Sequence, residues 1–116
     1  ACGASIRNFG MIWPVGQPAG ELHALACRSR DLWLELKAHD AVAVEECGSI
    51  HLAHHPDELA VQEEFCNRRT HEVRLLTPQE ITTRTSLANP VGLLGGLQSP
   101  AELRVDPRTA SARLAP

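Results

Sequence analysis

The chain has 116 residues, of which 43% are hydrophobic and only 3% aromatic, and its formal net charge is −3. This length suits one modest domain, and the scarcity of aromatic residues predicts a core of Leu, Val, Ile and Ala. Composition and charge exclude a nucleic-acid partner, because phosphate binding needs clustered cations and base binding needs aromatic rings. No apolar run approaches the ~20 residues that cross a bilayer.

The first element is a loop without helical or strand periodicity, GASIRNFGMIWPVGQPAG at residues 3–20. Glycine-rich loops before helices present backbone N–H groups to anions, and Ser5, Arg7 and Asn8 add polar donors. The pattern matches neither GxGxxG nor GxxxxGK[ST]. The loop by itself therefore leaves two interpretations open, a ligand contact and an ordinary surface loop.

Two helices and two strands are expected next. Apolar positions at intervals of three and four predict an amphipathic helix over residues 21–39. The runs VAVEE and SIHLAHH follow, and we expect them to pair as a β-hairpin because Gly48 accepts the positive φ of a tight turn. Acidic residues just after Pro56 then favour a second helix over residues 57–69.

The last third of the chain carries the clearest helix-start signals. Thr77, Pro78 and Glu80 form a capping box that predicts a short helix. The segments NPVGLLGGLQSP and ELRV are typical of short strands, and Asp106 with Pro107 predicts one more helix start. The order of elements predicts an α+β fold with antiparallel rather than doubly wound parallel strands.

Histidines raise the question of a metal site. The candidates are His51, His54 and His55, with Cys66 and His71 nearby. Zinc ligands pair at short fixed spacings, and neighbouring residues of a strand face opposite sides, so these imidazoles do not all converge. We therefore expect no metal site, and we expect solvated or core-edge histidines.

The cysteines are spread along the chain without a CxxC pair. Carboxylates next to Cys47 would raise the pKa of its thiol, so we expect no catalytic cysteine. Ordinary thiols fit a reducing, cytoplasmic setting. The four are Cys2, Cys27, Cys47 and Cys66.

Arg104, in the segment ELRVDP, has two interpretations. Its guanidinium fork is able to receive an anionic group of a substrate. A surface ion pair with a nearby carboxylate is the interpretation that we favour.

Four segments of the chain are informative when they are considered together. In chain order they are GASIRNFGMIWPVG, ECGSIHLAHHPDELAVQEEF, LLTPQEI and GGLQSPAELRVDP. On these residues, which cover nearly the whole chain, the sequence resembles the FAD-dependent oxidoreductases of the D-amino-acid oxidase superfamily. That superfamily includes glycine oxidase, sarcosine oxidase and D-amino-acid dehydrogenases. Within it, RNFGMIWPVGQP is most similar to a branch associated with phosphonate breakdown.

The resemblance implies site residues and a division into domains. Residues 1–39 would form the flavin-contacting loop and helix of an FAD-binding domain, 40–105 part of a substrate-binding sheet, and 106–116 the return to the FAD-binding domain. Trp13, His51 and Arg104 would lie on the substrate side. The implied FAD contacts are Gly3, Ala4, Ser5, Arg7, Asn8, Gly10 and Met11.

The implied reaction is oxidative deamination of a small amine, which in the phosphonate branch is an aminophosphonate. Hydride passes from the amine-bearing carbon to flavin N5, and water hydrolyses the imine to a carbonyl compound and ammonia. Arg104 would meet the phosphonate. The family opens with a strand, a GxGxxG turn and a helix, and none of these precedes Ala1. We therefore expect an internal piece of a longer enzyme, inactive by itself.

The competing hypothesis is a free-standing α+β binding module whose loop recognises a partner or a small anion. It predicts a complete chain that unfolds cooperatively and is indifferent to FAD. The flavoenzyme hypothesis predicts exposed apolar faces, above all on the helix over residues 21–39, and hence association, including with a second copy, or marginal stability.

Overall fold

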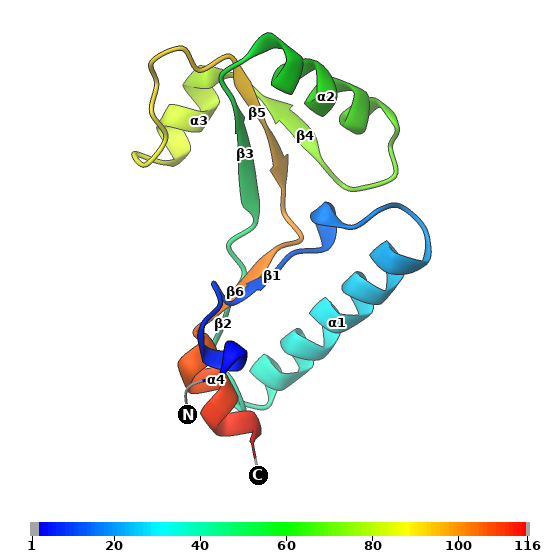
Figure 1. Cartoon of the computed structure of the whole chain (residues 1–116), viewed down its shortest axis with the longest axis vertical. Helices are drawn as coiled ribbons and strands as arrows, with labels where there is room; N and C mark the ends of the chain where they lie inside the picture. The colour runs from blue at the N-terminus through cyan, green and yellow to red at the C-terminus, as the bar shows by residue number, and fades with distance from the viewer. Residues whose placement is uncertain (1–2, 116) are drawn as a thin grey trace. The chain divides into compact units, whose positions relative to one another are not determined.

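Two three-stranded antiparallel sheets organise the chain, each in its own compact unit. The computed structural model describes residues 3–115, and the units are residues 1–47 with 101–116 and residues 48–100. The described residues form four α-helices, which are divided between these units and labelled in Figure 1. The mixed composition and the antiparallel pairing confirm the predicted α+β class.

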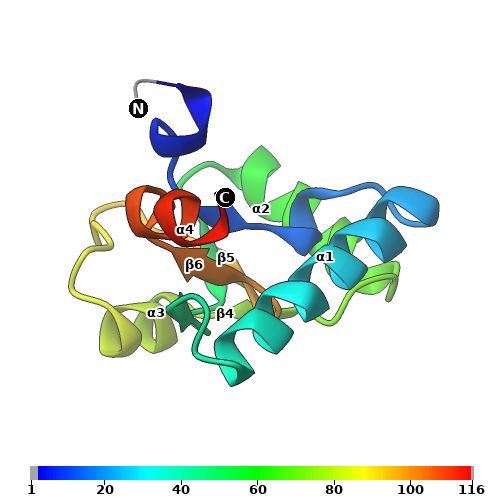
Figure 2. The same cartoon turned by 90° about the horizontal axis from the view of Figure 1, so that it is seen from below.

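The first unit is built on strand β6, which lies between β1 and β2. Helix α4 packs against the turn η1, as Figure 2 also shows, and α1 packs against η2, β1 and β2. Its elements are η1 (Ala4–Ile6), β1 (Met11–Ile12), η2 (Pro14–Gly16), α1 (Glu21–Ala38), β2 (Val44–Glu45), β6 (Leu103–Val105) and α4 (Pro107–Leu114). Its buried core is Val42, Val44, Leu103, Val105 and Ala110.

Helix α1 confirms the helix predicted from the apolar spacing, with His39 as its C-cap. No residue of α1 is fully buried. Leu22, Leu25 and Leu32 are 55%, 66% and 44% exposed. The exposed apolar face expected for this helix is therefore present.

The opening loop differs from the prediction. It was expected to lack regular structure, yet it contains the two 3₁₀ turns and the short strand β1. The periodicity was missed because β1 has only two residues, Met11 and Ile12, which pair with Arg104 and Leu103 of β6. Two residues carry no detectable alternation, so only the distant partner strand defines β1.

The second unit is a sheet with a helix on each face. Strand β5 lies between β3 and β4. A Cβ at Gly95 would approach Leu59 of α2, whereas one at Gly96 would approach Ile81 of α3. Adjacent residues of a strand face opposite sides, so α2 and α3 cover opposite faces. The elements are β3 (Ser49–Ala53), α2 (Pro56–Asn67), β4 (Arg74–Leu76), α3 (Pro78–Arg84) and β5 (Gly95–Ser99).

The predicted hairpin between VAVEE and SIHLAHH is wrong. Strand β2 pairs with β6, and β3 pairs with β5 over five residue pairs. Gly48 does adopt a positive φ of 63°, and a Cβ there would lie 2.7 Å from the carbonyl oxygen of Ser99. The glycine therefore lets the chain pass from one sheet to the other beside β5 instead of reversing it.

The helix starts follow the predicted capping. The Thr77 hydroxyl accepts from the Glu80 N–H at 3.3 Å, and a Glu80 carboxylate oxygen accepts from the Thr77 N–H at 2.8 Å. Asp106 accepts from the Arg108 N–H at 3.0 Å. Within residues 3–115, no helix combines the length and apolarity needed to span a membrane.

Candidate functional site

The side chain of Asn8 folds the loop of residues 3–11. Its amide nitrogen donates to the carbonyl oxygens of Ala4 and Ser5 at 3.1 and 3.0 Å, and its Oδ1 accepts from the Gly10 N–H at 2.8 Å. These three bonds use both ends of the amide. Asn8 therefore holds η1 against the bend that precedes β1, and its contact with a cofactor stays a prediction.

Gly10 fixes this loop to strand β6. It has a φ of +65°, and a Cβ there would lie 1.9 Å from the carbonyl oxygen of Val105. The Val105 N–H donates to the Gly10 carbonyl at 2.9 Å. Only a residue without a side chain permits this backbone approach.

Three large apolar side chains are uncovered around this bend. Phe9, Met11 and Trp13 are 87%, 57% and 40% exposed. A Cβ at Gly16 would lie 2.5 Å from Cε3 of Trp13, so the indole ring rests directly on that glycine. Clustered exposed apolar side chains mark surfaces that bind another molecule.

A hollow of about 640 Å³ lies between this loop and α4. The Ser111 hydroxyl donates to the Ser5 carbonyl at 3.1 Å and ties its two sides together. Within residues 3–115, the Ser5 hydroxyl and the Arg108 guanidinium have no partner. The hollow thus offers two unused donors beside an apolar wall. Its lining includes Gly3, Ser5, Ile6, Asn8, Trp33, Val105, Arg108, Ser111 and Leu114.

The predicted cofactor residues divide into two groups. Gly3, Ser5 and Asn8 line the hollow. The other four belong to the same loop or to β1 without lining it: Ala4, Arg7, Gly10 and Met11. The structure therefore brings part of the predicted set to one concave surface and uses the rest to shape the loop.

Arg104 is held in an ion pair. Its Nη2 donates to both carboxylate oxygens of Glu45, at 2.9 and 2.7 Å, between strands β6 and β2. The hydrogen bond from Arg104 to Glu45, followed by the charge of that carboxylate, raises the pKa of Arg104. This contact confirms the ion-pair interpretation. Where β6 pairs with β1, Arg104 lies opposite Met11.

His51 belongs to the other compact unit, whereas Trp13 and Arg104 belong to the first. Its Nε2 lies 3.3 Å from the Ser49 hydroxyl, and its carbonyl accepts from the Gln62 amide at 3.0 Å. The bond from Gln62 holds β3 to helix α2, whereas the contact with Ser49 lies within β3 itself. A substrate role for His51 stays a prediction.

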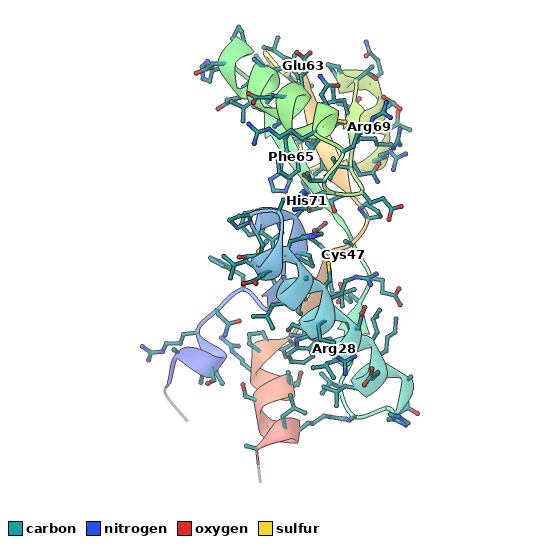
Figure 3. All side chains as sticks on the ribbon, turned by 90° about the vertical axis from the view of Figure 1, so that its right-hand side faces the viewer. Arg28, Cys47, Glu63, Phe65, Arg69 and His71 are labelled. Carbon is teal, nitrogen blue, oxygen red and sulfur yellow. The ribbon has the colours of Figure 1, made fainter. Side chains whose placement is uncertain are left out.

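No group of three or more His, Cys, Asp or Glu side chains suits a metal ion in the part of the chain that is described. The ring of His71 packs against that of Phe65 in a tilted arrangement, with centroids 4.8 Å apart (Figure 3). Cys27, Cys47 and Cys66 are free thiols, and Cys2 lies outside the described residues.

Sequence reasoning missed the contributions of Arg108, Ser111 and Glu102. The helix start at Asp106 contained a signal for the first two, because positions 108 and 111 are three apart and share a helix face. Glu102 is only 3% exposed, and its carboxylate accepts from the Val15 N–H at 3.1 Å. Nothing in the segment ELRV predicted that burial.

Comparisons with known proteins agree along the length of the chain. The family described as FAD dependent oxidoreductase matches residues 1–115. Glycine oxidase from Geobacillus kaustophilus is 25% identical with a TM-score of 0.81, over 98% of this chain and 34% of that one. No curated protein matches.

Two further solved structures share the fold. L-proline dehydrogenase from P. horikoshii has 20% identity and a TM-score of 0.80, over 98% of this chain and 31% of that one. L-α-glycerophosphate oxidase from Mycoplasma pneumoniae, solved reduced with FAD bound, has 21% identity and a TM-score of 0.78, over 98% and 32%. The chain spans about a third of the length of these structures.

Proposed function

The chain belongs to the FAD-dependent oxidoreductase family, and from that membership we propose that it supplies the cofactor loop of an enzyme that oxidises a small amine. The observation that carries the proposal is the loop of residues 3–11, closed by Asn8 and Gly10 over a hollow with unused donors. The similarity to glycine oxidase supports an amine substrate. Because the chain spans a third of that structure, catalysis is proposed for the longer enzyme.

The residues of the hollow and the exposed side chains of the adjoining loop fit FAD in their chemistry. The Ser5 hydroxyl and the Arg108 guanidinium are donors suited to phosphate or ring oxygens. The exposed side chains of Phe9 and Met11 offer an apolar surface suited to a flat ring. FAD, when bound, supplies the acceptor for the hydride that leaves the amine-bearing carbon.

The side chains of this chain would act by positioning and by excluding water. Asn8 and Gly10 hold the loop at a fixed distance from β6. Trp13, seated on Gly16, would shield the reacting carbon from solvent. A shielded site protects the substrate imine until it is released to water.

We propose the domain division expected from the sequence, with residues 1–39 and 106–116 in an FAD-binding domain and 40–105 in a substrate domain. The compact units support this division, although they place residues 40–47 and 101–105 with the first segment. We also propose a cytoplasmic setting, which the three free thiols support.

The flavin proposal is tested on the longer enzyme that carries this chain. We expect it to bind FAD and to show anaerobic bleaching of the flavin absorbance by glycine or sarcosine. Glycerol 3-phosphate is the comparison substrate, because a glycerophosphate oxidase shares the fold. Bleaching by glycerol 3-phosphate alone would contradict the amine substrate. If FAD does not change the stability of the protein, the flavin proposal is contradicted and the competing hypothesis of a free-standing binding module is favoured.

For the specific substrate we propose an aminophosphonate, with Arg104 as the residue that meets the phosphonate. The phosphonate would have to displace Glu45 from Arg104. In the longer enzyme, Arg104→Ala should therefore raise KM about tenfold or more for an aminophosphonate and little for a neutral amine. Glu45→Gln is the matched variant and should lower the same KM. Equal effects of Arg104→Ala on both substrates would remove Arg104 from this role.

A further inference from the structure

A second hollow, of about 360 Å³, lies entirely within residues 48–100. Arg74 pairs with Gln98 across β4 and β5, two positions from the pair of Leu76 with Gly96. Because Gly96 faces Ile81 of α3, the side chains of Arg74 and Gln98 lie on the α3 face. We call this the arginine hollow; it is lined by Glu72, Val73, Arg74, Arg84, Gln98 and Pro100.

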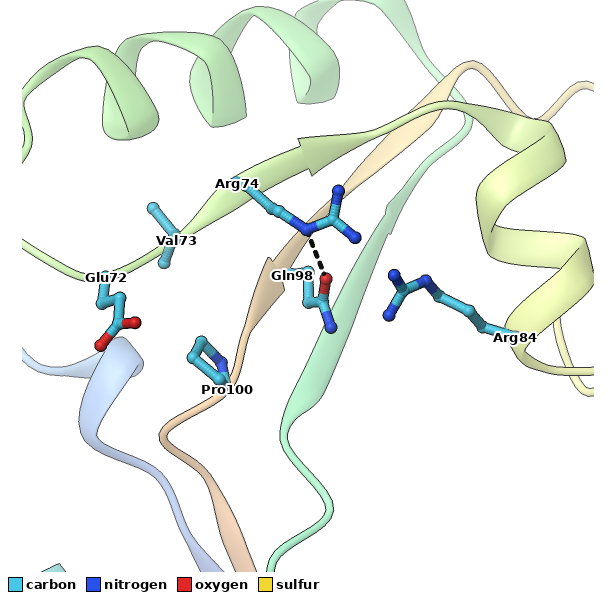
Figure 4. Close-up of a pocket in the computed structure, with 6 residues that line it drawn as sticks. All are labelled: Glu72, Val73, Arg74, Arg84, Gln98 and Pro100. Atoms are coloured by element: carbon cyan, nitrogen blue, oxygen red, sulfur yellow. Dashed lines mark hydrogen bonds between the residues drawn. The ribbon is translucent and has the colours of Figure 1, made fainter.

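Hydrogen bonds orient the donors of the arginine hollow. The Arg74 Nε donates to Gln98 Oε1 at 2.9 Å, and its Nη1 donates to Glu80 Oε1 at 3.3 Å. The first bond uses the acceptor of the Gln98 amide and leaves its NH₂ group as a donor. Figure 4 shows this amide between the guanidinium groups of Arg74 and Arg84.

Arg84 is the unused cation of the arginine hollow. It is the last residue of α3, and its guanidinium makes no hydrogen bond or ion pair with any residue between 3 and 115. Glu80 neutralises Arg74. Glu72 lies at the end of the hollow away from Arg84 in Figure 4, so the end with two arginines keeps an uncompensated positive charge.

We propose that the arginine hollow binds a small tetrahedral oxyanion, such as a phosphate or phosphonate group. The Arg84 fork would hold two of its oxygens, and the Gln98 NH₂ and the Arg74 Nη2 would hold the others. The volume lies at the lower end of the range of small-molecule sites. The proposal uses only residues 72–100 and does not rest on FAD or on the amine oxidation proposed above.

The test is a titration of the longer enzyme that carries this chain with inorganic phosphate at constant ionic strength, followed by NMR of selectively labelled glutamine side chains. We expect saturable shifts of the Gln98 side-chain amide, and about tenfold weaker binding in Arg84→Gln. Arg84→Lys should bind with intermediate affinity, because it keeps the charge but loses the fork. The matched control is Arg69→Gln, since Arg69 is an exposed arginine of the same unit without a partner within the described chain (Figure 3).

Equal weakening in Arg84→Gln and Arg69→Gln, or no saturable shift at Gln98, would overturn the proposal. A spectrum of each variant without phosphate verifies that it is folded, and Gln98→Leu provides a second variant if Arg84→Gln is not. Gln98→Leu should also weaken phosphate binding, which in this variant is followed by the shifts of the Arg84 guanidinium, because the Gln98 amide is absent. Methylphosphonate, sulfate and acetate identify the group: binding of the first two supports a tetrahedral oxyanion, whereas binding of acetate alone contradicts it.

Discussion

The two compact units differ in how their sheets are assembled. In residues 48–100, β5 pairs with β3 over five residue pairs and with β4 over three, all within one continuous stretch of chain. In the other unit, β6 makes two pairs with β1 and two with β2, and its partners come from before residue 47. The sheet of residues 48–100 forms from one local stretch of chain. The sheet built on β6 forms only when residues 101–116 meet residues 1–47.

This difference places the candidate functional surface in the unit with the shorter ladders. Its loop of residues 3–11 and the side chains of Phe9, Met11 and Trp13 are open to solvent. Binding loops are generally drawn from the less stable parts of a protein, because they must accommodate a ligand. Residues 48–100 would supply the stable part, and four substitutions test this division.

Replacing Ile81 with alanine should have the largest effect. Ile81 is fully buried between α3 and its sheet, so Ile81→Ala should cost about 2–5 kcal/mol of unfolding free energy. Urea unfolding and amide exchange over residues 48–100 measure the loss. Leu25→Ala, in α1 at 66% exposure, is the control and should cost less than about 0.5 kcal/mol. Equal losses would contradict burial of Ile81 as the source of the effect.

Gly10→Ala should come next, because it adds a steric clash to an unfavourable φ. A left-handed alanine costs about 1 kcal/mol by itself. Gly92 has a φ of +70°, close to the +65° of Gly10, but a Cβ added at Gly92 would meet no atom within 4 Å. Gly92→Ala should therefore cost about 1 kcal/mol, and Gly10→Ala at least about 2 kcal/mol. Thermal unfolding of both variants decides whether the contact with Val105 matters.

Thr77→Ala tests the local closure of the second unit. It removes the hydroxyl of the capping box and should cost about 1 kcal/mol. Thr83→Ala, within the same helix, is the control, because its hydroxyl bonds only to the Gln79 carbonyl and alanine favours the helix. Chemical denaturation should therefore leave Thr83→Ala unchanged or slightly more stable. A larger loss in that control would contradict a specific role for the cap.

Acid should have the smallest and most local effect. The Glu80 carboxylate accepts a hydrogen bond from the backbone N–H of Thr77, and the Glu58 carboxylate accepts one from the backbone N–H of His54. These bonds are the largest causes that lower the pKa of the two carboxyls below the ordinary value of 4.5. A lowered pKa contributes stability that is complete above the ordinary value and is lost as pH falls through the folded-state value. The protection factors of the amides at both helix starts, taken relative to the intrinsic exchange rate at each pH, should decrease as pH falls from about 5 to about 3.

Glu80→Gln is the variant that sharpens this test, and Glu63→Gln is its control. The first should flatten the pH dependence at the start of α3. The second should leave it intact, because Glu63 is exposed on α2 and has no partner among the residues described (Figure 3). An unchanged pH profile in Glu80→Gln would mean that this carboxylate does not stabilise the helix start.

Local signals predicted the helices of this protein well, because helices form from interactions within a few residues. The capping box at Thr77, the N-cap at Asp106 and the apolar spacing over residues 21–39 all gave the correct elements. The candidate site was only partly predictable. Ser5 and Asn8 were recognised in the loop, but Ser111 reaches the same hollow from more than one hundred positions away.

The sequence by itself determined the helices, their starts and the loop that resembles a flavoprotein motif, since each depends on short spacings and on residue chemistry. Only the tertiary structure decided that β2 and β3 lie in different sheets, that Gly10 meets Val105, and that Arg104 is bound to Glu45. Strand partners and ion pairs depend on segments far apart in the chain. A strand pairs with the distant segment that forms the more favourable hydrogen-bonded ladder with it, and no local sequence pattern specifies that segment.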